Sequence, residues 1–303
     1  MKTKKRSSFS RLAYSKKLAP YLFILPFVIA FCVFFAYPIM ETFSMSFQKV
    51  INLNTGRFVG FKNYARLDNA HFFNALKTST IYTLCMVCIM LIMPITLAVF
   101  LNSKMLKLKN FFRSVIFIPA LVSTISAGIA FRLIFGDTDI GFVNSIIVKL
   151  GGEPIQWKMG YATGIFIMVI LASWREMGIN MIYCLSALQT ISAELYESAE
   201  MDGANKFQQF VFITIPQVKP IIIYVLTLTI INGYRMFTEG YVYWNETNPG
   251  DNGLTIVRYI YNQAFQKNDM GLGSAIGVVL LLIILVINLI QLKGFGMFDK
   301  EDR

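Results

Sequence analysis

Charged residues and histidine are scarce in this sequence. Charged side chains make up 15% of its 303 residues, whereas a soluble domain typically has about 25%. His71 is the single histidine, which excludes His-rich metal sites such as the HExxH motif. No G-x-x-x-x-G-K-S/T motif occurs, so the chain cannot bind ATP through a Walker A loop. The sequence therefore predicts neither a metal site nor a cofactor.

Cysteines are also few. Cys32, Cys85, Cys88 and Cys184 all lie inside apolar stretches, which argues against a disulfide framework. Cys85 and Cys88 have the CxxC spacing of a redox motif. Within an apolar helix, however, we expect them to serve as two small packing residues.

Long hydrophobic runs dominate the chain instead. Hydrophobic residues make up 55% of it, and the mean hydropathy is +0.56. A helix needs about 20 mostly apolar residues to cross the hydrocarbon core of a bilayer. Six segments meet this requirement, near 19–40, 76–101, 111–135, 161–186, 211–233 and 273–292. The composition therefore predicts an all-α membrane protein with six transmembrane helices and excludes an ordinary soluble enzyme.

Most of the positive charge flanks the apolar runs. The net charge is +11, and no acidic residue interrupts the basic residues before the first run, which are Lys2, Lys4, Lys5, Arg6, Arg11, Lys16 and Lys17. The connection after the second run contains Lys104, Lys107, Lys109 and Arg113. Basic flanks of this kind follow the positive-inside rule and give no reason to expect nucleic-acid binding.

This charge bias also predicts the topology. We expect a basic cytoplasmic tail over 1–18, a six-span transmembrane domain over 19–292 and a cytoplasmic C-terminal tail over 293–303. An even number of spans returns the C-terminus to the cytoplasm, so both termini lie on the same side of a cell membrane.

The segment 190–216 predicts a short helix, a sharp turn and a second helix that re-enters the membrane. Ser192 is a plausible N-cap, and Glu194 and Glu197 lie near the positive end of the helix that it would begin. Gly203 suits the stop or turn. One interpretation is an amphipathic helix that lies among the lipid headgroups.

The charge of this segment favours a different interpretation. Its helix carries four acidic residues, with Lys206 as the only nearby base: Glu194, Glu197, Glu200 and Asp202. An acidic helix gains no electrostatic attraction from an anionic inner leaflet. A protein partner with basic residues fits this helix better.

Three stretches of this segment resemble the EAA loop of binding-protein-dependent ABC importer permeases. They are Tyr196-Glu197-Ser198-Ala199, Asp202-Gly203-Ala204 and Ile213-Thr214-Ile215-Pro216. The resemblance implies the type I importer permease fold, in which this loop forms a cytoplasmic coupling helix that docks into a separate ATPase. It assigns ATPase coupling to Glu197, Ser198, Ala199, Asp202, Gly203 and Ala204. Ser198 stands where an alanine is usual in the family.

Other stretches are similar to sugar permeases of the MalF-like type within this family. The segment 58–64 reads FVGFKNY, and related stretches surround Phe112-Arg113 and residues 261–271. YSKKLAPYLF, AVFLNSK, FRLIFGD, LASWREMGIN and KNDMGLGSAIG are similar to arabino-oligosaccharide permeases of Gram-positive bacteria. The resemblance implies oligosaccharide import across a bacterial plasma membrane, with another oligosaccharide or a sugar derivative as the alternative substrate.

The same resemblance implies the partners. They are a second homologous permease subunit, two copies of a cytoplasmic ATPase subunit and an extracellular solute-binding lipoprotein. The chain itself would then be a transport subunit that lies in membrane lipid, and ATP hydrolysis would occur in the partner.

Polar and charged residues inside the predicted spans have two interpretations. The fourth span contains Trp174, Arg175, Glu176 and Asn180, and the outer end of the fifth contains Asn232, Tyr234, Arg235 and Glu239. Buried ionisable groups are costly and usually face a cavity or each other. They are either two walls of a sugar pathway, with Trp174 stacking on a sugar ring, or a structural Arg–Glu pairing.

Two other classes of membrane protein fit less well. An ion-driven secondary transporter needs titratable carboxylates near the membrane centre, and only Glu176 offers one. An intramembrane enzyme needs a convergent nucleophile and base, and the single histidine lies in a predicted outer loop.

Overall fold

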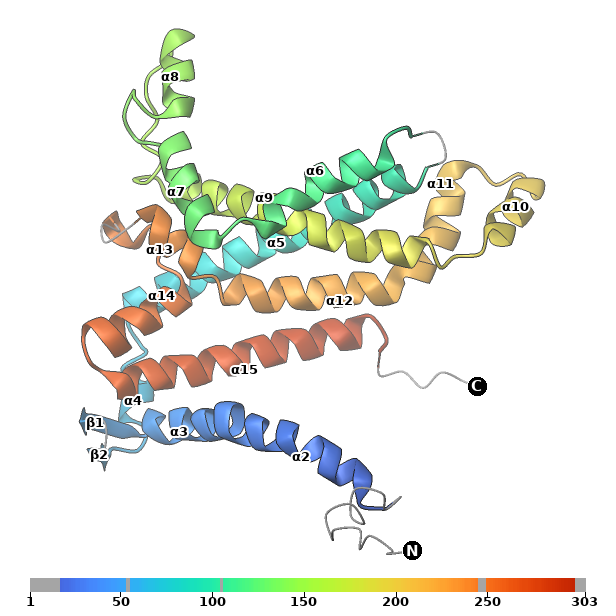
Figure 1. Ribbon diagram of the computed structural model, residues 1–303. Helices are drawn as coiled ribbons and strands as arrows, with labels where there is room; N and C mark the ends of the chain where they lie inside the picture. Colours follow the sequence, from blue (N-terminus) through green and yellow to red (C-terminus); the bar gives the residue numbers. More distant parts are fainter. Residues whose placement is uncertain (1–16, 53–54, 104–105, 245–248, 298–303) are drawn as a thin grey trace, which may run out of the picture.

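The computed structural model describes residues 17–52, 55–103, 106–244 and 249–297 (Figure 1). Most of the predicted basic tail over 1–18 and the last part of the C-terminal tail therefore lie outside the described residues. The chain forms a bundle of long helices, with short helices and a two-stranded hairpin at its ends.

Within the described residues, five helical segments are long and apolar enough to cross a membrane: Pro20–Ser46, Ala70–Asn102, Tyr161–Leu188, Lys206–Tyr234 and Met270–Gly294. They correspond to five of the six predicted spans. The first comprises α2 (Ala19–Phe31), a π-helical turn η1 (Cys32–Ala36) and α3 (Tyr37–Ser46). The others are α5 (Ala70–Asn102), α9 (Tyr161–Leu188), the segment that ends in α12 (Ile215–Tyr234), and α15 (Met270–Gly294).

The remaining predicted span, over 111–135, is not one continuous helix. In its place α6 (Lys109–Leu121) and α7 (Thr124–Ile134) meet at an angle of 96°. Val122 and Ser123 break the helix because both have extended backbone conformations, with ψ of 131° and 135°. At about 1.5 Å per residue, α6 alone is too short for a hydrocarbon core of about 30 Å. The bundle has six spans only if this bent pair acts as one of them.

The two ends of the bundle differ. One end carries the antiparallel strands β1 (Gln48–Asn52) and β2 (Thr55–Phe58) and the short helix α4 (Lys62–Ala65), and we call it the hairpin end (Figure 1). The opposite end carries α10 (Ala193–Met201) and α11 (Lys206–Gln209), and we call it the loop end.

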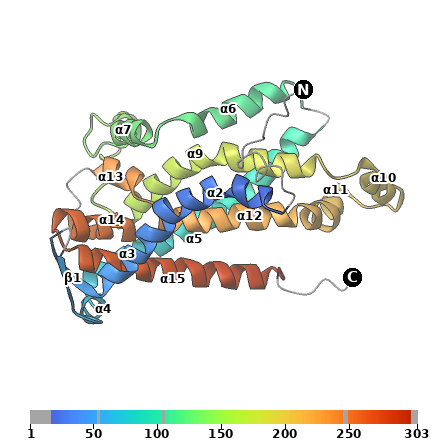
Figure 2. The ribbon, with the colours of Figure 1, turned by 60° about the horizontal axis from the view of Figure 1, so that its bottom comes forward.

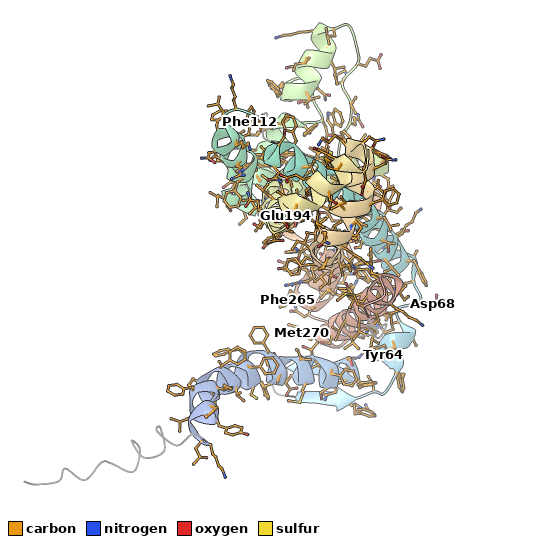
Figure 3. All side chains as sticks on the ribbon, turned by 90° about the vertical axis from the view of Figure 1, so that its right-hand side faces the viewer. Tyr64, Asp68, Phe112, Glu194, Phe265 and Met270 are labelled. Atoms are coloured by element: carbon orange, nitrogen blue, oxygen red, sulfur yellow. The ribbon has the colours of Figure 1, made fainter. Side chains whose placement is uncertain are left out.

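The first helix packs on the rest of the bundle near the hairpin end. None of the apolar window of Pro20–Ser46 is buried. The α3 helix packs against α15, whereas α2 diverges from the other long helices (Figure 3). Asn63 fixes the hairpin end, because its amide donates to the Ser46 and Gln48 carbonyls, each at 2.9 Å. Because α4 and β1 also pack against α15, the FVGFKNY segment joins the first helix to α15.

An arm projects from the hairpin end, with α8 (Phe142–Lys149) at its tip (Figure 1). Asn144 is buried within it, and its amide donates to the Gly136 and Ile155 carbonyls at 2.9 Å. Its side-chain oxygen accepts from Trp157 Nε1 at 3.0 Å. One buried asparagine of α8 thus links this helix to the irregular segments before and after it.

The core lies where α5 packs against α9 and α12. One cluster fills the region between α5, α9 and α13 (Thr238–Trp244), and its fully buried members include Met86, Met90, Met168 and Trp244. A second lies between α5, α14 (Ile256–Tyr261) and α15. Lipid tails are as apolar as these side chains, so close van der Waals packing has to hold the helices together.

Glycine permits one of the closest helix contacts. A Cβ atom at Gly178 of α9 would lie 2.4 Å from the Ile116 carbonyl oxygen and 2.7 Å from the Phe117 Cα of α6. Backbone atoms cannot move aside to make room for a Cβ atom as the end of a flexible side chain can.

We therefore expect Gly178→Ala to separate α6 from α9 and to lower the free energy of unfolding by about 1–3 kcal/mol, the usual range for overpacking. The measurement is the thermal midpoint of the protein in lipid nanodiscs. Gly277→Ala is the matched control, because Gly277 also lies in a spanning helix and no described atom stands within 4 Å of the place that a Cβ would take there. Equal midpoints for the two variants would contradict the contact.

Candidate functional site

The segment between α9 and α12 forms the predicted helix and turn. Ser192 caps α10, its hydroxyl accepting from the Glu194 N–H at 3.3 Å. At the other end, the Gly203 N–H donates to the Glu200 carbonyl at 3.1 Å and the Ala204 N–H to the Ala199 carbonyl at 2.9 Å. This pair of bonds is a Schellman motif, which needs a left-handed residue, and Gly203 has φ of +83°.

The chain then re-enters the bundle. Asn205 and Gln208 form a capping box at the start of α11, and a π-helical turn η2 (Phe210–Thr214) leads into α12. The Tyr196 hydroxyl lies 2.9 Å from Thr214 Oγ1. This hydrogen bond attaches α10 directly to the base of the α12 segment.

The exposed face of α10 is acidic with apolar residues between the acids. Glu194, Glu197 and Asp202 are exposed, as are Leu195 and Met201. Figure 1 and Figure 2 both show α10 beyond the ends of α9 and α12. The helix is therefore available to a partner at the loop end of the molecule.

The other residues to which the resemblance assigns ATPase coupling lie in α10 or in the turn after it. Ser198 is exposed, whereas Ala199 and Ala204 are half-buried and supply backbone groups to the turn. Glu200 pairs with Lys206 across the turn. A cavity of about 590 Å³ lies behind the helix, lined by residues that include Tyr196, Glu197, Glu200, Asn102 and Phe210.

A second cavity lies where the helix of the fifth predicted span breaks. The α12 helix ends at Tyr234, short of the hairpin end that α5 and α15 reach (Figure 1), and α13 begins at Thr238. The cavity, of about 260 Å³, is lined by Tyr82, Thr124, Glu176, Asn232, Arg235, Met236, Phe237, Thr238 and Glu239. Four of the predicted pathway residues thus meet here: Glu176, Asn232, Arg235 and Glu239.

Charged groups from two elements meet beside this cavity. Arg175 Nη1 of α9 donates to Glu239 Oε1 of α13 at 3.0 Å, and the two side chains are 19% and 15% exposed. Glu176 and Arg235 line the cavity and form no ion pair within the described part of the chain. An Arg–Glu pair is therefore present, but it joins Arg175 of α9 to Glu239 of α13 and not to Glu176 of the same span.

Three of the eight predicted pathway residues lie away from this cavity. The Trp174 ring packs on Phe131 at 5.8 Å between centroids and is 41% exposed. Asn180 is buried and donates to the Met90 sulfur at 3.4 Å. Tyr234 is also buried, with its hydroxyl 3.1 Å from Thr80 Oγ1. The reason is the helical period, which points residues of one span in different directions.

Sequence reasoning missed an aromatic cluster next to the cavity. Phe237 lies 5.2 Å from Tyr241 and 5.3 Å from Tyr261, and Tyr261 lies 5.7 Å from Phe265, all between ring centroids. The spacing of four within each pair was a visible helical signal. Nothing in the sequence indicated that the two pairs meet.

A buried arginine supports this cluster. Arg258 donates to the Gly240 carbonyl at 3.4 Å and lies over the Tyr241 ring, 5.8 Å from its centroid. Burial lowers the pKa of the Arg258 guanidinium, and the neighbouring Tyr241 acts in the opposite direction. Arginine nevertheless stays charged, so a buried cation faces the aromatic ring.

Comparison with known proteins identifies the family. Residues 90–292 match the family described as binding-protein-dependent transport system inner membrane component. The chain belongs to this family of permeases. The match includes both α10 and the cavity residues from Glu176 to Glu239, and it confirms the family expected from the EAA-like loop. Membership of this transport family gives no support to the ion-driven and enzymatic alternatives.

Full-length relatives agree with the family. The permease is 51% identical over 297 residues to the arabinooligosaccharides transport system permease protein AraP of Bacillus subtilis, a match that covers 98% of this chain and 95% of that protein. It is 33% identical over 301 residues to the lactose transport system permease protein LacF of Rhizobium radiobacter, covering 96% and 97% of the two chains.

A solved structure supports the fold. A chain of a bacterial ABC transporter involved in the import of the acidic polysaccharide alginate superposes with a TM-score of 0.82 at 22% sequence identity. The match covers 93% of the permease and 96% of that chain. The expected all-α, type I ABC importer permease fold is thus confirmed, and the protein is an inner-membrane component with several spanning helices.

The hydrogen bond between Tyr196 and Thr214 can be tested by itself. We expect Tyr196→Phe to loosen α10, because a single hydrogen bond contributes about 1 kcal/mol, which corresponds to roughly fivefold faster amide exchange. Hydrogen exchange of the α10 amides in nanodiscs is the measurement. Tyr64→Phe, which removes a hydroxyl contact to Ser46 at the hairpin end, should leave α10 exchange unchanged. Identical α10 exchange in both variants would show that the bond does not hold this helix.

Proposed function

We propose that this permease is the membrane subunit of an ATP-driven importer whose substrate is an arabino-oligosaccharide. Relatives at 51% and 46% identity are both named arabinooligosaccharides transport system permease proteins, and their matches cover 98% and 99% of this chain. The more distant relative named for lactose keeps another oligosaccharide as the alternative substrate.

The observation that carries the mechanism is the continuity of one helical segment. Lys206–Tyr234 begins at the turn after α10 and ends at the cavity with Asn232 and Arg235. A displacement of α10 is passed to Thr214 through Tyr196. A rigid helix transmits that displacement along its axis to the cavity, which is what alternating access requires.

The loop end fits an ATPase partner. In this proposal the loop end is cytoplasmic, both termini are cytoplasmic, and α10 docks into a cytoplasmic ATPase subunit, of which the complex holds two copies. The exposed Glu194, Glu197 and Asp202 favour a basic surface on the partner, while Leu195 and Met201 offer apolar contact area. Gly203 permits the turn after the docking helix.

The cavity fits part of a sugar pathway. Sugar sites combine hydrogen-bonding groups with an aromatic surface in a concave site. Asn232, Thr238 and Glu176 offer the first, and Phe237 begins the aromatic cluster. In this proposal a second homologous permease completes the pathway, and an extracellular solute-binding lipoprotein delivers the sugar. Stacking of Trp174 on a sugar ring stays a prediction. In this structure the Trp174 ring packs on Phe131.

The coupling assignment is tested by charge reversal. Glu197→Lys places a cation where we propose that a basic partner surface docks, and like charges in an interface oppose binding. We expect at least about tenfold weaker association with the ATPase, which corresponds to about 1.4 kcal/mol. Co-purification with the ATPase across a concentration series measures it. Glu153→Lys, at an exposed site in the arm, is the control, and equal association of both variants would reject the role of Glu197.

The substrate is tested with the complete complex in nanodiscs. ATP hydrolysis is measured with the cognate binding protein and a panel of arabino-, xylo- and malto-oligosaccharides. We expect stimulation by arabino-oligosaccharides. Stimulation by another class alone would reassign the substrate while keeping the importer, and sugar movement by this chain alone down an ion gradient would overturn the ABC mechanism.

A further inference from the structure

The ion pair between Arg175 and Glu239 joins two elements that are also connected through the loop end. Arg175 lies in α9, which runs to Leu188 and continues into α10. Glu239 lies in α13, which follows the end of α12. The chain therefore forms a closed path: α9, the α10 turn, α12, α13, and back to α9 through the ion pair.

The ion pair between Arg175 and Glu239 lies between elements that move relative to one another if α10 is displaced. If a partner displaces α10, then α9 and the α12 segment shift relative to one another, because each is attached to one end of that turn. The α13 helix also packs against α7, since a Cβ at Gly128 would lie 2.9 Å from Val242 Cγ1. A shift of α9 against α13 must stretch or break the contact between Arg175 and Glu239.

The ion pair between Arg175 and Glu239 leaves one of its hydrogen-bond donors without a partner among the described residues. The Nε of Arg175 is buried and has no hydrogen-bond partner among the described residues. A buried ion pair contributes stability only when further hydrogen bonds satisfy its remaining donors. Leaving one donor unpaired lowers the free energy needed to separate Arg175 from Glu239.

Alternative partners stand beside the pair. Glu239 itself lines the cavity, together with Arg235 of opposite charge and Glu176. A carboxylate that leaves Arg175 thus finds a second guanidinium or an entering hydroxyl group within the same space. Two arrangements of the same charges are available, which is the property that a switch requires.

We propose that Arg175 and Glu239 form a latch that holds α13 on α9 until the α10 turn moves, so that ATP hydrolysis is restrained in the absence of loaded binding protein. The two residues act as a positioning pair through the helices that they join. This inference rests on the proposed function, because it supposes that an ATPase docks on α10.

The first experiment measures ATP hydrolysis by the complete complex in nanodiscs, with and without loaded binding protein. We expect Arg175→Gln and Glu239→Gln each to raise hydrolysis without the binding protein at least about fivefold, the lower end of usual coupling energies, and to reduce its stimulation correspondingly. The double variant Arg175→Glu with Glu239→Arg should restore the stimulation, because it restores the pair. Arg66→Gln is the control, since it breaks an ion pair with Asp269, 2.7 Å long, at the hairpin end.

A second readout separates the latch from the proposed function. In a background without the native cysteines, Asn232→Cys reports access to the cavity through its reaction rate with a membrane-impermeant thiol reagent. We expect a labelling rate at least about fivefold higher when either charge is removed, and an unmodified rate in the charge-swapped protein. This measurement needs neither the ATPase nor the sugar.

Each outcome decides something. Unchanged labelling and unchanged hydrolysis in both neutral variants overturn the latch. A lowered thermal midpoint with unchanged labelling and stimulation shows a structural ion pair, which also overturns it. Absence of any sugar-stimulated hydrolysis in the unmodified complex rejects the proposed function, whereas the labelling rates still decide whether the pair closes the cavity.

Discussion

The absence of water from the hydrocarbon layer is the constraint on which this structure depends. Backbone N–H and C=O groups at membrane depth need partners inside the chain, so spanning segments are helices. The same constraint limits where those helices end. The α12 helix stops inside the bundle, where the Thr255 hydroxyl donates to the Met236 carbonyl just beyond the helix end, and the cavity lies at this break. A break in a spanning helix thus also provides space for polar side chains within the membrane.

At the loop end, where α10 is exposed, capping residues determine where the helix begins and ends. Ser192 starts α10 and Gly203 ends it, each satisfying backbone groups that the helix leaves open. The Tyr196–Thr214 hydrogen bond and the Glu200–Lys206 ion pair join this short helix to the segment that follows it. Local sequence preferences therefore make the helix, and these side-chain contacts attach it to the segment that reaches the cavity.

The fold was largely predictable because hydrophobic length is a local property. Five spans and the α10 turn follow from apolar runs, Ser192 and Gly203. The bend between α6 and α7 was not predictable, since residues 111–135 are apolar enough to span. What turns the chain there is the extended backbone at Val122 and Ser123 together with packing of α7 on α13, a contact with residues more than a hundred positions away.

The candidate site divides in the same way. The sequence by itself determined which polar residues enter the membrane and which residues build the acidic α10 helix, because composition and spacing are local. Only the tertiary structure decided that Glu176, Arg235 and Glu239 share a cavity while Trp174 turns away from it. It also decided that Arg175 pairs with Glu239 rather than with an acid of its own span. The physical reason is that helix rotation and crossing are set by packing between helices, which no single span encodes.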